Sequence, residues 1–303
     1  MSTASDANSS PQEVESTRGR ARSILSIVLL IASLLVLLYP VVTTYYQNQK
    51  QADIADAYRN STIQGKDFSE LIEAAHAYNA ESAGAPILDP WLARVAKNNR
   101  PYQDYLEQLN VTGNPKDPMG VIAIPSIKVK LPVYHGTEPD VLERGIGHLY
   151  GSSLPVGGEG MHSVLTAHTG LAHATLFDDL DEVVTGDRIY LNVAGQQMTY
   201  EVDKIETVLP TEISSLQPVP GKDLLTLITC TPYGINSHRL LVHAHRVPND
   251  DAAARDAFNG GSSIQWWMLL VLALIVLIVI AYFARRRMNA HHAPRHRSTR
   301  SAA

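Results

Sequence analysis

The sequence predicts a mostly β domain that is attached to a membrane by a helix at each end. Two apolar runs, residues 24–42 and 264–283, each hold about the 20 residues that a helix needs to cross a bilayer. Between residues 119 and 247, short apolar and β-branched segments alternate with glycine and proline turns, which is typical of β structure. The 303 residues carry a formal net charge of −5, which gives no sign of nucleic-acid binding.

The N-terminal part is expected to be a disordered segment followed by a membrane anchor. Residues 1–22 are rich in Ser and Thr and lack an apolar pattern, so we expect no folded structure there. A transmembrane helix is predicted over residues 23–43. A cleaved signal peptide is the alternative, but its apolar part is usually about 7–15 residues long, and no Ala-x-Ala site directly follows this run. We therefore favour an uncleaved anchor.

The second anchor is predicted over residues 264–284. This run opens with Trp266 and Trp267, which suit a membrane interface, and arginines 285–287 follow it. Arginines flank the outer end of both apolar runs, and positively charged loops tend to remain in the cytoplasm. The predicted topology therefore places both termini, including the basic tail 285–303, in the cytoplasm and the intervening domain on the extracytoplasmic face of the cell membrane.

The region between the first anchor and the β domain, residues 44–117, is predicted to be a helical extension. Residues 47–80 mix Ala, Glu, Gln and Lys with spaced apolar positions, which favours helices separated near Gly65. A solvated spacer is the alternative for the first half of this stretch.

The β domain is predicted over residues 118–248, with a linker at 249–263. In chain order we expect strands at 120–125 and 129–134, a short helix at 138–145 and a glycine-rich loop at 151–160. Five further strands are expected at 163–167, 188–193, 197–209, 224–229 and 239–244.

Neither a cofactor nor a metal ion is expected. The glycine-rich loop is not followed by the Lys-Ser/Thr pair of a nucleotide-binding P-loop. No Cys-His cluster has metal-ligand spacing, and we interpret the acidic run Asp178, Asp179, Asp181 and Glu182 as a solvated face and not as a calcium site.

The chain contains one cysteine, Cys230, at the end of the predicted strand 224–229. Pro232 and Gly234 then turn the chain, and the next strand begins at Arg239, so an antiparallel pair would place the thiol opposite the guanidinium. A buried structural cysteine is the alternative, because free Cys packs like a small apolar residue. The predicted extracytoplasmic location favours a reactive cysteine, since an unpaired thiol tends to oxidise there.

A thiolate nucleophile usually needs a base or a charged partner, and the chain has 12 histidines. We single out His168 because it ends the apolar run 163–167 and precedes a Thr-Gly turn. A structural histidine at a strand end is the alternative. His162 has the same strand parity but lies about 20 Å away at the usual rise per residue, so the two histidines cannot serve one site.

Three motifs stand in the order and spacing found in sortases: TAHTG at residues 166–170, TLITCTP at 226–232 and NSHRLLV at 236–242. Residues 119–247 therefore resemble this family. The resemblance implies an eight-stranded β-barrel with short helices, and a cysteine transpeptidase whose catalytic residues are Cys230, His168 and Arg239.

The chemistry of these three side chains fits acyl transfer. A Cys230 thiolate can attack a peptide carbonyl and form a thioester, which an amine can open. His168 can protonate the leaving amine and later deprotonate the incoming one. The permanently charged Arg239 can donate hydrogen bonds to the oxyanion or orient the substrate backbone.

The segment at about residues 85–93 contains Asp89, Pro90 and Trp91, and it is too short and too rich in proline for a core helix. A surface loop with a packed tryptophan is the alternative. The segment resembles the lid of class C, pilus-building sortases. This resemblance implies that the aspartate approaches the catalytic arginine and that the tryptophan covers the catalytic cysteine.

A class C sortase would cleave an LPxTG-like sorting signal and join pilin subunits to a lysine amine by isopeptide bonds. The implied partners are pilin or surface proteins with such signals, an acceptor lysine of a pilin or an amine of a cell-wall precursor, and the membrane. Three alternatives remain. They are a sortase of another class that anchors proteins to the cell wall, a cysteine protease that uses water with Asn236 as the orienting residue, and a non-enzymatic membrane-tethered scaffold.

Overall fold

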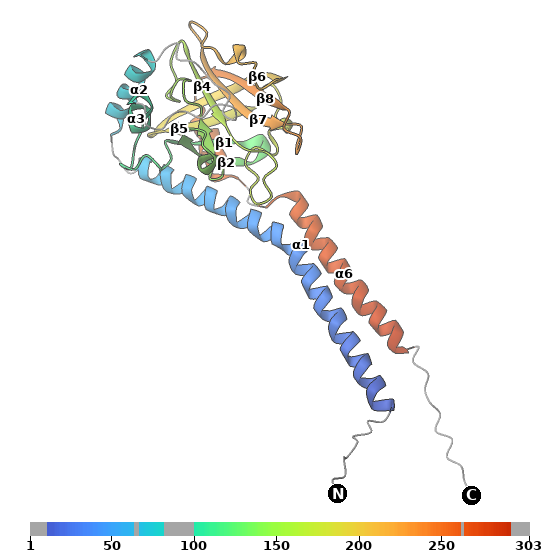
Figure 1. The fold of residues 1–303 in the computed structure, drawn as a ribbon. Coiled ribbons are helices and arrows are strands. Elements are labelled where there is room, and N and C mark those ends of the chain that lie inside the picture. Colours follow the sequence, from blue (N-terminus) through green and yellow to red (C-terminus); the bar gives the residue numbers. More distant parts are fainter. Residues whose placement is uncertain (1–10, 64–66, 82–99, 262–263, 292–303) are drawn as a thin grey trace, which may run out of the picture. The chain divides into compact units, whose positions relative to one another are not determined.

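The computed structural model describes residues 11–63, 67–81, 100–261 and 264–291. The chain divides into two units (Figure 1). The first contains helix α1 (Pro11–Ile63) up to Val42, together with helix α6 (Trp266–His291). The second runs from Thr43 to Ser263.

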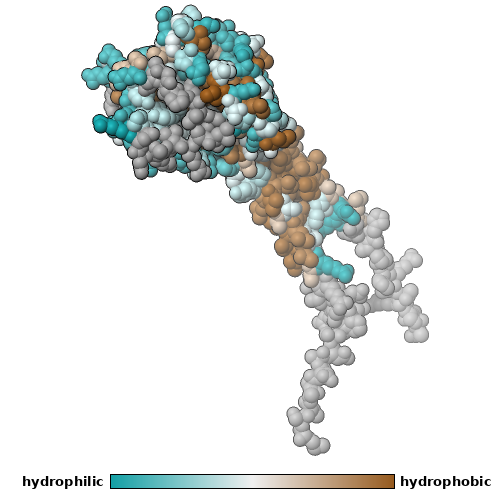
Figure 2. Space-filling view, turned by 45° about the horizontal axis from the view of Figure 1, so that its top comes forward, coloured by the Kyte–Doolittle hydropathy of each residue, from teal (hydrophilic) through white to brown (hydrophobic). Residues whose placement is uncertain are grey.

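Apolar helices make up the first unit. By length and composition, α1 over Ala21–Thr62 and α6 over Trp266–Met288 can each cross a membrane. Figure 2 shows the apolar side chains of this unit in brown. Within the unit the two helices contact each other, since Ser26 Oγ lies 3.4 Å from Tyr282 Oη.

The start of α1 corrects the prediction of disorder for residues 1–22. Residues 11–22 are helical and continue without a break into the apolar run, whereas residues 1–10 lie outside the described part of the chain. Pro11 suits the first position of a helix, and Glu, Gln, Ala and Arg, which are good helix formers, make up more than half of this stretch. Extending an existing helix needs no new nucleation, so the adjoining apolar helix decides the structure of this polar segment.

The second unit is built on a closed barrel of eight strands, which confirms the predicted fold class. The strands are β1 (Gly120–Ile124), β2 (Val129–His135), β3 (Ile146–His148), β4 (Met161–Thr166), β5 (Arg188–Val193), β6 (Gln196–Val208), β7 (Asp223–Thr231) and β8 (His238–Val247). Around the barrel they follow the order β1-β2-β3-β4-β7-β8-β6-β5. The pairs β2/β3 and β4/β7 are parallel, and the other neighbouring pairs are antiparallel.

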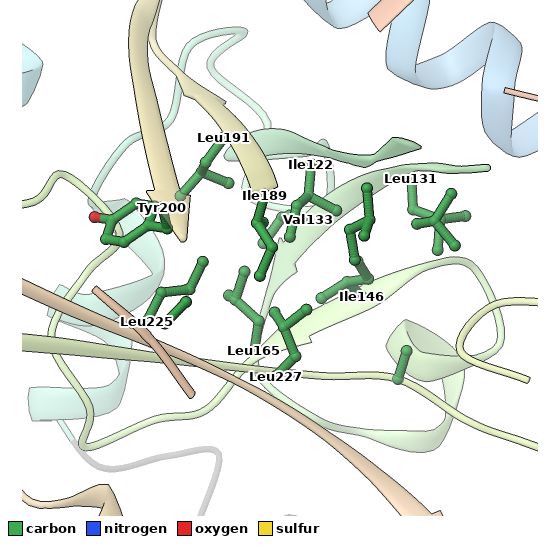
Figure 3. Packing of buried hydrophobic residues seen from close by; sticks show 14 of the residues in the cluster. Ile122, Leu131, Val133, Ile146, Leu165, Ile189, Leu191, Tyr200, Leu225 and Leu227 are labelled. Atoms are coloured by element: carbon green, nitrogen blue, oxygen red, sulfur yellow. The ribbon is translucent and has the colours of Figure 1, made fainter. Parts of the chain in front are cut away.

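Successive side chains of β7 alternate between the interior and the outer surface of the barrel. Leu225 and Leu227 are fully buried in the interior among apolar side chains of the other strands (Figure 3). Ile228 belongs to a separate apolar cluster on the outside. Cys230 has the same parity as Ile228, so the thiol lies on the outer face of the barrel wall.

Helices α2 (Ser69–Glu81) and α3 (Arg100–Glu107) pack against the apolar cluster in the interior of the barrel. Asn79 of α2 is tied to Leu154 by two reciprocal hydrogen bonds, with Nδ2 donating to the carbonyl at 3.1 Å and Oδ1 accepting from the backbone N–H at 2.7 Å. Between α1 and α2 only residues 64–66 are not described, which agrees with helices separated near Gly65. Shorter elements connect the strands: α4 (Pro139–Leu142), η1 (Pro125–Ile127), η2 (Leu180–Glu182) and η3 (Ser214–Leu216).

The predicted linker at 249–263 contains a helix, α5 (Asp251–Asn259), which corrects that prediction. Its first turn is capped by Asp250, whose side chain accepts a hydrogen bond from Ala253 N at 3.1 Å. Phe258 is buried in a cluster with the last part of α1 and with strands β1 and β5. A cap and an apolar face are therefore enough to order this short alanine-rich segment.

The last part of α1, within the second unit, is fixed to the barrel by polar contacts. Tyr58 Oη donates to Met119 O at 2.6 Å and accepts from Ala194 N at 2.9 Å. Lys130 of β2 and Asp56 form an ion pair at 2.9 Å, in which the lysine is nearly buried. Residues 43–63 are therefore part of the folded domain and not a solvated spacer.

Candidate active site

The sole cysteine of the chain faces an arginine on the neighbouring strand. In the antiparallel β7/β8 pair, Cys230 is the register partner of Arg239, which confirms the predicted pairing of these two positions. The connecting turn is closed by Pro232 O, which accepts from Ile235 N at 3.0 Å and from Asn236 N at 2.9 Å. The turn therefore sets which residue of β8 stands opposite the thiol.

His168 comes to the same place from strand β4, on the other side of β7. The parallel β4/β7 register pairs Thr166 with Ile228, and two residues further along each chain stand His168 and Cys230. Hydrogen bonds continue this pairing beyond the end of β4, from Ala167 N to Ile228 O at 3.2 Å and from the Thr229 hydroxyl to Ala167 O at 2.9 Å. The structure thus brings all three predicted catalytic positions into one row across three adjacent strands.

Burial differs along this row. Arg239 is 6% exposed, and its Nη1 donates to Asn236 O at 3.3 Å and to His238 O at 3.1 Å. These carbonyl oxygens compensate part of the cost of burying a charge and fix the guanidinium beside the thiol. Cys230 is only partly buried.

The electrostatic surroundings favour the neutral form of His168. Burial lowers the pKa of its imidazole, and the charge of His173 acts in the same direction, while the carboxylate of Glu143 opposes both. A neutral imidazole at neutral pH can accept a proton from a thiol, and the resulting imidazolium can give the proton to a leaving group.

Asp178 holds the turn that follows His168. Its Oδ1 accepts from Gly170 N at 2.6 Å and from the Thr169 hydroxyl at 3.2 Å, and Phe177 N donates to His168 O at 3.1 Å. Burial raises the pKa of Asp178 to about 6 against the lowering effect of these hydrogen bonds. The interpretation of this aspartate as part of a solvated face is therefore wrong, because it is partly buried and accepts hydrogen bonds from the turn that follows His168.

Helix α1 contacts the same loop from its other side. Asn48 Nδ2 donates to the Thr175 hydroxyl at 2.8 Å, and Asn48 Oδ1 accepts from Thr175 N at 3.1 Å. The Thr44 hydroxyl donates to Ala172 O at 3.5 Å. No sequence signal pointed to these contacts or to Asp178, since each joins residues that are unrelated by local periodicity.

An apolar cluster packs against the outside of the barrel wall next to the row. Its members come from β4, β7 and β8, from the end of β6 and from the β3–β4 and β6–β7 connections: Leu149, Val164, Val208, Ile213, Leu216, Ile228 and Leu241. Most of these side chains are buried, so the cluster supports the strands that carry the row.

His162 belongs to a different network, as its distance from His168 predicted. Its Nε2 lies 2.7 Å from the Thr226 hydroxyl, which in turn lies 2.8 Å from His243 Nδ1. Glu206 also belongs to this network, with Oε1 3.0 Å from His243 Nε2.

The predicted lid, which includes Trp91, lies outside the described residues.

Among the described residues, no group of three or more His, Cys, Asp or Glu side chains is placed to hold a metal ion.

Comparison with known proteins connects this geometry to a family. The model of the sortase domain matches residues 122–247. Among solved structures, sortase A from Corynebacterium diphtheriae is 53% identical and superposes with a TM-score of 0.61. The match covers 67% of this chain and 95% of the chain of that structure. Sortase C-1 from Actinomyces oris is 51% identical over 60% of this chain and 98% of its own, with a TM-score of 0.57.

More distant relatives are matched over a smaller part. Sortase A of Streptococcus agalactiae is 31% identical over 129 residues, which are 42% of this chain and 51% of that protein. Sortase D of Bacillus subtilis is 32% identical over 131 residues, or 63% of its length. The chain thus spans between half and two thirds of these curated relatives.

Proposed function

Because the chain belongs to the sortase family, we propose that it is a cysteine transpeptidase in which Cys230, His168 and Arg239 are the catalytic residues. The observation that carries this proposal is the row formed by the ends of β4, β7 and β8. A structural cysteine would not need a buried guanidinium on one side and an imidazole of lowered pKa on the other.

The proposed reaction has two steps that share one acyl intermediate. The thiolate of Cys230 attacks the scissile carbonyl, a carbon–sulfur bond forms, and the carbon–nitrogen bond breaks as His168 gives a proton to the leaving amine. An incoming amine then attacks the thioester, loses its proton to His168 and releases the thiolate. Arg239 donates hydrogen bonds to the oxyanion that develops in both steps.

We assign the chain to class C, in which the donor is an LPxTG-like sorting signal and the acceptor is a lysine amine of a pilin subunit. The support is the high identity to Actinomyces oris sortase C-1 and 39% identity to Streptococcus pneumoniae sortase C, whose structure was described in terms of pilin substrate specificity.

The proposed location is the cell membrane, with the apolar parts of α1 and α6 as anchors. Residues 23–43 and 264–284 would span the bilayer, both termini would be cytoplasmic, and the domain at 118–248 would be extracytoplasmic. Substrates held in the same membrane by their own sorting-signal helices would then reach the enzyme at a high effective concentration.

Product analysis tests this proposal against its alternatives. The full chain in detergent is incubated with an LPxTG-like peptide and a lysine-containing acceptor peptide, and the products are identified by mass spectrometry. We expect an isopeptide-linked product. Acceptance of a cell-wall precursor amine instead would indicate a sortase of another class, hydrolysis alone would indicate a protease, and no turnover would indicate a scaffold.

Asp178 is predicted to affect the rate by holding His168 in place. Asp178→Ala removes the acceptor of two hydrogen bonds in the turn, and we expect kcat to fall by about 10- to 100-fold because a small misplacement of a catalytic group is costly. Asp178→Asn keeps an acceptor oxygen and should retain most of the rate. Steady-state kinetics measures both, with the exposed Asp181→Ala in the same loop as a control; equal rates for the two Ala variants would contradict this role.

The lid is proposed to gate the thiol. Asp89 and Trp91 lie outside the described residues, and the support is the resemblance together with a solved lid mutant of the Corynebacterium diphtheriae relative, which is 52% identical. If the lid covers Cys230, replacing Asp89 and Trp91 by Ala should speed labelling of the thiol by a bulky charged reagent. The labelling rate is measured in native buffer with the fold checked by circular dichroism, and unchanged rates would leave this segment without a gating role.

A further inference from the structure

A small cavity lies between helix α1 and the barrel, away from the catalytic row. It has a volume of about 160 Å³, and its walls include the α1 residues Gln47, Lys50 and Gln51, together with Lys116 from the segment before β1 and Arg144 from the segment after α4. None of these side chains has a role in the proposed transpeptidase reaction.

Gln51 is the unusual member of this set. Its side chain is 1% exposed, and neither its Nε2 nor its Oε1 has a hydrogen-bond partner among the described residues. Burying both polar atoms of an amide without partners is unfavourable. A buried, unpartnered amide in the wall of a cavity therefore indicates a polar group that occupies the cavity in the functional protein.

The charged side chains around the cavity indicate the sign of the charge that this group carries. Lys50 and Lys116 are exposed and form no ion pair with another described residue. Arg144 is held at the wall, since its Nη1 donates to Lys116 O at 3.1 Å and its Cζ lies 4.6 Å from the Tyr134 ring centre. The acidic wall residue, Asp117, already accepts hydrogen bonds from Thr112 at 2.7 Å and Asn114 at 3.1 Å.

We propose that this cavity binds a phosphate group. Three cationic side chains and an amide donor match its negative charge and its several acceptor oxygens, and the volume admits one such group. Two sources share this chemistry, a free phosphate ion and the headgroup of an anionic lipid. The lipid is suggested by the sequence of α1, in which Lys50 follows the apolar run ending at Val42 by about two helical turns.

The test measures ligand binding by the full chain in a non-ionic detergent, so it does not depend on transpeptidase activity. Three probes are titrated: inorganic phosphate, short-chain phosphatidylglycerol and short-chain phosphatidylcholine. A ligand that binds the folded state alone raises the midpoint of thermal unfolding, by about 5 °C at roughly 100 times its Kd. We expect saturable shifts with phosphatidylglycerol, smaller ones with inorganic phosphate and none with the zwitterionic lipid beyond that of detergent alone.

Variants locate the binding to this cavity. Lys50→Gln together with Lys116→Gln should weaken the affinity by at least about 10-fold, because two charges facing the phosphate are lost. The control, Arg188→Gln with Lys222→Gln, removes two charges elsewhere on the same domain and should leave the affinity unchanged. Gln51→Leu should stabilise the unliganded protein, since it removes an unsatisfied amide, and still weaken binding.

Each outcome bears on the proposal. Binding of phosphatidylglycerol alone assigns the cavity to a lipid headgroup, and binding of inorganic phosphate alone assigns it to the free ion. The proposal would be overturned if neither phosphatidylglycerol nor inorganic phosphate binds. It would also be overturned if the cavity variant and its control bind these probes with equal affinity.

Discussion

Replacing Cys230 with Ala is expected to abolish turnover, with a loss of at least about 10⁴-fold in kcat. The chain contains no second cysteine that could take over as nucleophile. The substitution removes a single sulfur atom at a partly exposed position, so the fold should be kept. The measurement is the rate of isopeptide formation by the full chain, with circular dichroism to confirm folding.

A matched control comes from the neighbouring outward-facing position Thr226. Thr226→Ser keeps the hydroxyl in the network with His162 and His243 and should leave the rate within about twofold. Persistent transpeptidation by Cys230→Ala would show that the thiol is not the nucleophile and would remove the basis of the assigned mechanism.

Arg239→Lys is the prediction with the second largest effect. The charge is kept, but the ammonium of lysine is a point charge and cannot reproduce the planar donors of a guanidinium that is held by two backbone carbonyls. Because the guanidinium of Arg239 is proposed to stabilise the oxyanion, kcat should fall on the order of 10²-fold or more. KM should change much less, because the interaction strengthens in the transition state.

Arg246→Lys is the control for this change, since Arg246 lies on the same strand and its guanidinium stacks over the Tyr200 ring away from the row. Steady-state kinetics of both variants with the same peptide pair gives the comparison. Near-normal kcat for Arg239→Lys would mean that this arginine contributes charge alone, and the oxyanion would need another donor.

Local patterns in the sequence predicted much of the barrel wall. Alternation of β-branched residues with glycine and proline turns located β1, β2, β5, β6, β7 and β8 to within a few residues. The turn after Pro232 was enough to predict that Cys230 and Arg239 stand opposite each other, because a short antiparallel connection fixes its own register.

Contacts between distant segments could not be predicted in this way. The parallel β4/β7 pairing, which brings His168 to Cys230, joins strands that are separated in the sequence by β5 and β6. The meeting of these two residues was therefore implied by the family resemblance alone. The sequence around Asp178 gives no local signal of its role, because the path of the loop determines which residues form hydrogen bonds with it. Helix α5 was assigned to a linker because its apolar face is too short to give a periodic pattern.

Trapping the acyl-enzyme tests the central claim most directly. The full chain is mixed with an LPxTG-like peptide without an acceptor amine, quenched in acid and analysed by intact mass spectrometry and peptide mapping. We predict an added mass equal to the acyl part of the peptide, located on Cys230 and removed by hydroxylamine, which cleaves thioesters. No adduct on a chain that consumes the peptide, or an adduct on another residue, would contradict Cys230 as the nucleophile of this protein.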